Sequence, residues 1–444
     1  MGRAYYHELK QEYSEALADL SQVTVLHAWF LPAVFEKARM GMLLQDLDLV
    51  HEASQLILQK DPNNIDGLRL AIHLHLCSDN KQSTAAGLLA DLLRNIEHRE
   101  PRNAYLCLAV VKSCARLAGR GATLVLQKTM AIIERARRLN PRESAFVVEL
   151  ADQLFLLEDY KAALAAYKST ANLDELNMEA MYGAIQCLVV LGDLDEAEQQ
   201  LEFLAEVSVS TGKSASLPYL MAQLCWRKHR HGARCRDLLD ESIEIQTKRM
   251  RPQHDFTFYA ELNPDRRLGI AHLYITISHF ECKGPHVEES YSLLRAVDIL
   301  EQLTNLVPGL MDAHLMLARV YLRMNNSEAA QRCIHSALAL DFGSSSAHLL
   351  LAQVLVAARS LPEMGQVGIE SNSSFYRSRK HLETTDMDRV MVFLLLAEVH
   401  IHFNHFPEAT KTIQDAMTRF SGTPEEVTYT ASYYLLKLSI SHMG

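Results

Sequence analysis

The segment CWRKHRHGARC at positions 225–235 places two cysteines and two histidines within eleven residues. Thiolate and imidazole groups are the usual ligands of zinc, and Cys225 and His229 are spaced to share one face of a helix. Structural zinc sites, however, usually use short-spaced ligand pairs that tight turns orient. Here His231 and Cys235 lie on either side of a glycine, with Cys235 at the start of a second helix. We therefore expect a basic turn with a buried thiol, and no metal site.

The same segment also carries arginines and a lysine, which could contact phosphate groups. The chain as a whole has a formal net charge of -10, which would repel a nucleic-acid backbone. No H-E-x-x-H, Walker A or G-x-S-x-G motif occurs in the sequence. We predict no nucleic-acid partner, no cofactor and no enzymatic activity, although an enzyme with an irregular site in this segment stays an alternative.

The elements that carry these residues are predicted to be helices. The chain of 444 residues contains only 18 glycines and 12 prolines, and it is rich in alanine and leucine. An apolar content of 48% with 22% charged residues is typical of a packed domain. No apolar run approaches the ~20 residues that a membrane-spanning helix needs, so direct membrane insertion is not expected.

A period of 34 residues runs along the chain. In the stretch that begins at Glu143, the small residues Ala151 and Ala163 would let two helices approach closely across a polar turn. Adding 34 to position 163 leads to Ala197, and adding 34 to position 318 leads from Ala318 to Ala352. This helix-turn-helix period is that of the tetratricopeptide (TPR) repeat, whose units bury their apolar faces only when stacked. The sequence predicts an all-α TPR solenoid, a right-handed superhelix; an unrelated helical bundle is the alternative.

Breaks in this period divide the chain. We expect a first solenoid segment over 1–246, an irregular connection over 247–266, and a second solenoid segment over 267–356. A flexible basic loop would follow over 357–386, and terminal repeats over 387–444. Neither end carries the polar cap of a finished solenoid, which predicts either a segment of a longer solenoid or a partner that covers the ends.

In a TPR superhelix the first helix of each repeat lines the concave face, where an extended segment or an amphipathic helix of a partner can bind. An equally open alternative is that these side chains pack on neighbouring turns of the same superhelix. The candidate partner-binding residues are Tyr182, Gln186, Val189, Leu315, Arg319, Leu322, Leu349 and Gln353.

Several stretches outside the repeat consensus resemble the tetratricopeptide repeat protein 21 family. They are QQLEFLAEVSVSTGKSA (199–215), AELNPD (260–265), LVPGLMDAHLMLARVYL (306–322), SAHLLLAQV (346–354) and EATKTIQDAMTRFSGTPEEV (408–427). The resemblance runs in order along nearly the whole chain and covers a middle portion of the longer family members. The 357–386 region departs from it, as a shortened splice form or an imperfect gene model would.

This resemblance implies a large TPR subunit of intraflagellar transport complex A, which acts in retrograde transport and assembly of cilia. It implies a non-enzymatic scaffold at the ciliary base, in the cilium or flagellum and in the cytoplasm. Other complex A subunits would be its partners, together with adaptors for ciliary membrane-protein cargo. The alternative is a generic TPR adaptor or co-chaperone that binds peptide segments of client proteins.

Overall fold

The computed structural model describes residues 1–120, 122–174, 176–211, 214–249, 256–281 and 290–342. It also describes 344, 346–347, 350–351, 353–354, 407, 410–411 and 414. The expected loop over 357–386 lies outside these residues, as does nearly all of the expected terminal segment. None of the described helices is both long enough and apolar enough to cross a membrane.

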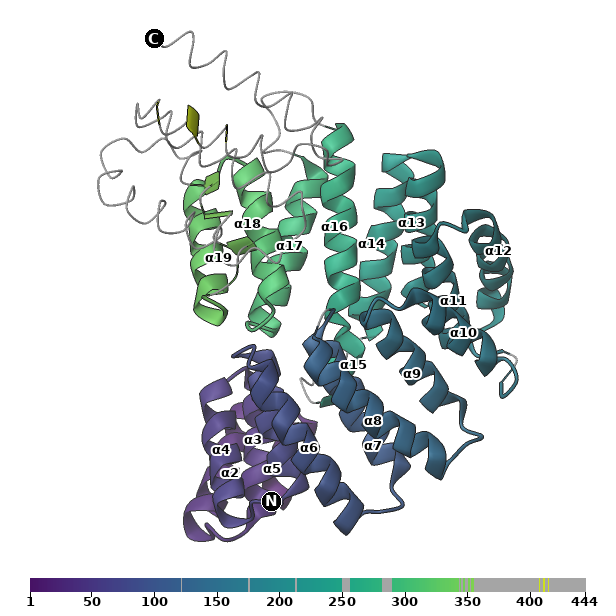
Figure 1. The fold of residues 1–444 in the computed structure, drawn as a ribbon. Coiled ribbons are helices and arrows are strands. Elements are labelled where there is room, and N and C mark those ends of the chain that lie inside the picture. The colour runs from purple at the N-terminus through teal and green to yellow at the C-terminus, as the bar shows by residue number, and fades with distance from the viewer. Residues whose placement is uncertain are drawn as a thin grey trace. The chain divides into compact units, whose positions relative to one another are not determined.

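In this described part, the regular elements are helices, as the sequence predicts (Figure 1). Their bounds are α1 Gly2–Leu9, α2 Tyr13–Leu26, α3 Leu31–Leu44, α4 Leu47–Lys60, α5 Ile65–Cys77, α6 Gln82–Arg99, α7 Ala104–Ala118, α8 Thr123–Leu139, α9 Ser144–Leu156, α10 Tyr160–Thr170, α11 Met178–Leu191, α12 Leu194–Thr211, α13 Ser216–His229, α14 Gly232–Arg249, α15 Phe256–Leu262, α16 Pro264–Glu281, α17 Tyr291–Leu306, α18 Met311–Arg323 and α19 Ser327–Leu340.

Helices α9 and α10 form a repeat as the period predicts. Ala151 and Ala163 are both fully buried, and they belong to one apolar cluster with Phe155 and Tyr167. Glu158 takes the left-handed conformation in the turn, and the Asp159 carboxylate accepts the Ala162 N–H at 3.1 Å. Because a small side chain occupies the contact position of each helix, the two axes can approach closely.

Asparagine or aspartate side chains start several of the other helices. In each case the side-chain oxygen accepts the backbone N–H three residues further on, which satisfies a donor that the helix cannot pair itself. These caps are Asp46 for α4, Asn64 for α5, Asn103 for α7, Asn177 for α11 and Asn326 for α19.

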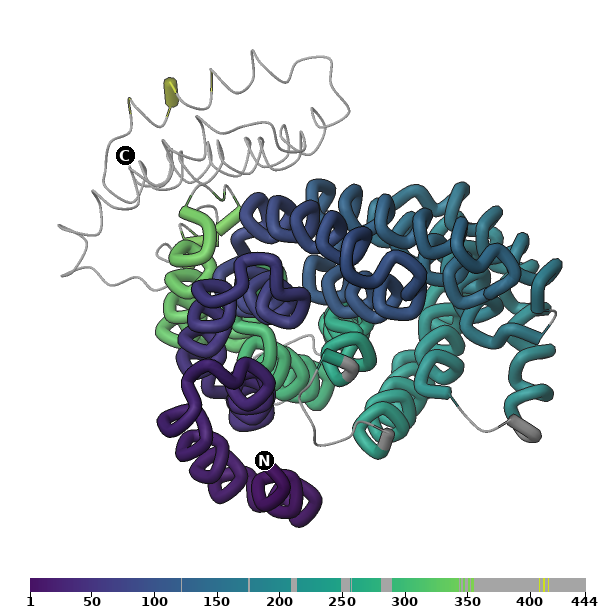
Figure 2. Tube along the Cα trace, turned by 90° about the horizontal axis from the view of Figure 1, so that it is seen from below, coloured from purple at the N-terminus to yellow at the C-terminus, as the bar shows by residue number. Residues whose placement is uncertain are grey.

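The chain divides into two compact units. Unit 1 comprises residues 1–283 and 290–310, and unit 2 comprises residues 284–289 and 311–444. In unit 1 each helix from α1 to α5 packs on the next, α6 packs on α8, α7 pairs with α8, and the row continues through α14 (Figure 2). In unit 2 helix α18 packs on α19 around Leu315, Ala318, Ala330 and Ile334.

The range 247–266, expected to be an irregular connection, contains helical structure. Helix α14 continues to Arg249, and α15 and the start of α16 follow at Phe256 and Pro264. The aromatic residues drive this order, because Phe258 and Tyr259 are buried and α15 packs on α7. The sequence shows their apolar character but not the distant surface that receives them.

Candidate functional site: a polar cavity in unit 1

The basic segment at 225–235 comprises the end of α13, a tight turn at Arg230 and His231, and the start of α14. Both thiols are buried, and burial raises the pKa of Cys235 to about 12, so this thiol is protonated at neutral pH. The imidazoles of His229 and His231 are exposed instead. Among the described residues no group of three or more His, Cys, Asp and Glu side chains is arranged to hold a metal ion.

Most cations of this segment have structural partners. Lys228 pairs with Asp195 and Glu198 on α12 at 2.6 Å, and Arg227 donates to the Val189 carbonyl on α11. The Arg230 guanidinium lies 5.2 Å from the centroid of the Trp226 ring. The contacts of Arg227 and Lys228 join α13 to α11 and α12, so these two basic residues have a structural role.

A cavity of about 1020 Å³ lies within unit 1. One face of α7 lines it with Tyr105, Ala109, Lys112 and Arg116, whose spacing of three to four residues places them on one side of the helix. Faces of α11 and α13 line it in the same way, through residues such as Tyr182, Gln186 and Tyr219. Helix α15 and the start of α16 add Phe256, Glu261, Asp265 and Arg266, and residues of α5, α9, α10 and α14 also contribute to the lining.

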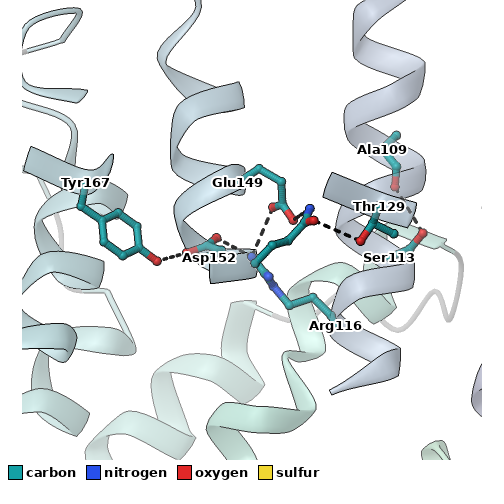
Figure 3. A network of polar contacts seen from close by, with 8 residues as sticks. Ala109, Ser113, Arg116, Thr129, Glu149, Asp152 and Tyr167 are labelled. Carbon is teal, nitrogen blue, oxygen red and sulfur yellow. Dashed lines mark hydrogen bonds and ion pairs between the residues drawn. The ribbon is translucent and has the colours of Figure 1, made fainter. Parts of the chain in front are cut away.

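A buried polar network extends from the cavity wall into the repeat (Figure 3). Arg116 on α7 donates to Asp152 and, at 3.3 Å, to Glu149, both on α9. Asp152 also accepts the Tyr167 hydroxyl from α10, and Gln153 links Glu149 to Thr129 on α8. The network joins the four consecutive helices α7 to α10. Three of its members, Arg116, Asp152 and Tyr167, also line the cavity.

The charges in this network influence one another strongly. Burial raises the pKa of Glu149 to about 7, although Arg116 opposes that shift. Burial also opposes the charge on Arg116, but Glu149 and Asp152 outweigh this effect and raise the pKa of the guanidinium. Arg116 therefore stays charged, while the Glu149 carboxyl is partly protonated near neutral pH.

The candidate residues of unit 1 divide between the cavity and the core. Tyr182 and Gln186 line the cavity, as their predicted place on a first helix suggests. Val189 is 1% exposed and belongs to the apolar cluster between α11 and α13, which also includes Tyr182. Val189 thus packs on the neighbouring repeat, which is the alternative that the sequence left open.

The candidate residues of unit 2 show the same division. Leu315 is buried in the cluster of α18 and α19, whereas Arg319 is exposed. Leu322 and Gln353 are half-buried, and Leu322 packs against the edge of that cluster. Leu349 lies outside the described residues.

Sequence reasoning missed Lys112, Arg116, Asp152 and Arg266. The sequence does contain a signal for Arg116. Glu149 follows it by 33 residues, close to one repeat length, and has the opposite charge. Arg266 has no such signal: it belongs to a segment that breaks the period, and only the folding of α15 onto α7 brings it to the cavity.

Two family models match the chain. The model described as "Tetratricopeptide repeat protein 21 second ARM domain" matches residues 87–359, and "Tetratricopeptide repeat protein 21 ARM repeat" matches residues 348–437. Tetratricopeptide repeat protein 21B from Homo sapiens is 32% identical over 97% of this chain and 36% of its own length. Tetratricopeptide repeat protein 21A from Mus musculus is 29% identical over 99% of this chain and 37% of its own length. The chain thus spans little more than a third of these relatives.

Among solved structures, a monomeric IFIT1 mutant with Gppp-AAAA is similar in fold, with a TM-score of 0.51 and 12% identity. The similarity covers 95% of this chain and 94% of that one. At this identity it shows a shared helical-repeat fold. Since the first family model alone covers more than half of the chain, and the human relative nearly all of it, the chain belongs to the tetratricopeptide repeat protein 21 family.

Proposed function

We propose that this chain is part of a non-enzymatic scaffold in intraflagellar transport complex A, acting in retrograde ciliary transport and cilium assembly. The observation that carries the proposal is the family membership, which extends in sequence over 97% of the chain. A solenoid of helix pairs supports it, because such folds present extended surfaces to other proteins.

Under this proposal the partners are other complex A subunits and adaptors for ciliary membrane-protein cargo. The protein would be found in the cilium or flagellum, at the ciliary base and in the cytoplasm. The net charge of -10 favours protein partners over nucleic acid.

Affinity purification of the tagged chain from ciliated-cell extract, followed by mass spectrometry, tests the proposal. We expect the other complex A subunits to be recovered, and a charge-reversed variant of an exposed residue, Arg319→Glu, serves to test the surface of unit 2. Recovery of chaperones alone, from a preparation that melts cooperatively, would contradict the proposal and favour a co-chaperone adaptor.

A further inference from the structure

Two cationic side chains line the cavity in unit 1 without the ion pairs that their neighbours make. Lys112 on α7 and Arg266 on α16 both line it, and both are half-buried. Within the described residues, neither of them makes an ion pair. Their neighbours differ in this respect, because Arg116 is paired with Asp152, and Arg120 binds Asp265 through two bonds of 2.6 and 3.1 Å.

Both cations belong to the part of the cavity wall around Arg116. Lys112 precedes Arg116 by one helical turn on α7, so the two side chains share a face. Arg266 is close enough to Arg116 for the two charges to repel each other. Burial lowers the pKa of Arg266 and Arg116 lowers it further, while this shift is only partly opposed by Tyr219, Asp152 and Asp265. The fold therefore holds the desolvated charge of Arg266 near that of Arg116, which lowers the free energy of unfolding.

The acidic side chains of the cavity do not remove this charge. Asp152 and Asp265 are already bound to Arg116 and Arg120. The remaining two, Glu179 and Glu261, are exposed to solvent, where a charge is strongly screened. The interior of the cavity consequently favours one carboxylate of a ligand.

The rest of the lining indicates an extended chain as the ligand. The volume of about 1020 Å³ is at the upper end of the ~300–1000 Å³ of small-molecule sites, and is large enough for several residues. Aromatic side chains such as Tyr105 and Phe256 and the amide of Gln186 can contact apolar and backbone groups.

We propose that this cavity binds an extended peptide segment of a partner protein through a single Asp or Glu side chain, held by Lys112 and Arg266. Apolar or aromatic residues on either side of that carboxylate contact the aromatic wall. The inference rests on the proposed scaffold function, because it assumes a protein partner.

A phage-displayed library of random 12-residue peptides, selected on the full 444-residue chain, tests the proposal without naming the partner. We expect the selected peptides to share one Asp or Glu flanked by apolar residues. In fluorescence anisotropy, replacing that residue by Asn or Gln weakens binding at least tenfold. The double variant Lys112→Gln/Arg266→Gln does the same, while Arg137→Gln/Arg138→Gln on the exposed face of α8 binds normally.

Thermal melting distinguishes a binding role from a structural one. Since Arg266 is an unneutralised charge, Arg266→Gln should melt at the wild-type temperature or above it, whereas Arg116→Gln, which breaks the buried network, should melt lower. Three results would overturn the proposal: no selected peptides, peptides whose binding ignores the double variant, or an Arg266→Gln melting temperature as low as that of Arg116→Gln. If complex A subunits are still recovered in any of these cases, the scaffold function stands without this site.

Discussion

Glu149 shows how burial alters a single residue of this protein. Its side chain is fully buried on α9, and its carboxylate has Arg116, Asp152 and Gln153 as neighbours. A carboxylate held away from water gains a higher pKa unless its partners fully compensate, and here the pKa rises to about 7. The folded protein therefore binds a proton that the unfolded chain releases near pH 4.5.

This difference predicts how stability depends on pH. Between pH 4.5 and 7 the folded state holds more protons than the unfolded state, so raising the pH lowers the free energy of unfolding. We expect a contribution of about 1–3 kcal/mol from Glu149 over this range. Urea denaturation at pH 5 and pH 7.5 should show this loss in the wild type and a smaller one in Glu149→Gln. The exposed Glu179→Gln serves as control, and equal pH dependence in all three proteins would contradict the assignment.

At the scale of elements, close helix contacts depend on small residues. Gly183 on α11 faces the ring of Tyr167 on α10, and a Cβ atom there would overlap the ring. Tyr167 cannot move away easily, because it is 4% exposed and its hydroxyl binds Asp152. Gly87 on α6 is also helical, but a Cβ there would meet open space.

These two glycines form a matched pair for substitution. Gly183→Ala should destabilise the protein by about 1–3 kcal/mol through overpacking. Gly87→Ala should stabilise it by about 0.5–1 kcal/mol, because alanine is the better helix former. Denaturation midpoints of both variants measure this, and a neutral Gly183→Ala would show that α10 and α11 can separate without cost.

Helix α15 is anchored by its aromatic residues. The Tyr259 ring lies 4.4 Å from the His73 imidazole between centroids, and Phe256 contacts the same imidazole at 5.6 Å. Burial lowers the pKa of His73 to about 3, so the imidazole is neutral and packs as an aromatic ring.

Truncating this anchor should release the helix. Tyr259→Ala is expected to cost about 3–5 kcal/mol, as for other large buried aromatic side chains. Hydrogen exchange in α15 should quicken more than in α3. The exposed Tyr5→Ala, at 62% exposure, should change stability by less than about 0.5 kcal/mol. Unchanged exchange in α15 would mean that other contacts hold it.

At the scale of the molecule, unit 1 contains contacts that a plain solenoid lacks. In most repeat proteins each repeat touches only its neighbours. Here the Gly309 N–H donates to the Cys77 carbonyl at the end of α5, at 2.6 Å, and the Cys77 thiol donates to the Leu306 carbonyl at 3.4 Å. Arg120 and Asp265 join two further segments that are 145 residues apart. Such contacts couple the unfolding of distant repeats.

Gly309→Ala tests this coupling. A Cβ at this position would lie 2.9 Å from the Cys77 carbonyl oxygen, so the two backbones would have to separate. We expect a loss of about 1–3 kcal/mol and a smaller urea m-value, because the repeats would unfold less cooperatively. Gly87→Ala again provides the control. A wild-type m-value in Gly309→Ala would show that neighbouring repeats alone make unit 1 cooperative.

The sequence alone determined the class of fold and the family. Alanines 34 residues apart and polar turns act within one helix pair or between neighbouring ones, so their pattern is visible along the chain. The stretches outside the repeat consensus identified the family, because they can be compared position by position with the sequences of its members. The same local periodicity placed Tyr182 and Gln186 on the first helix of a repeat.

Only the tertiary structure decided how distant segments meet. The folding of α15 onto α7 brings Arg266 beside Arg116, although 150 positions separate them in the sequence. Burial, which depends on all neighbours at once, set the pKa of Glu149 and placed Val189 in the core. A repeat pattern specifies contacts between neighbouring helices, whereas the cavity and its unpaired cations result from contacts over more than a hundred residues.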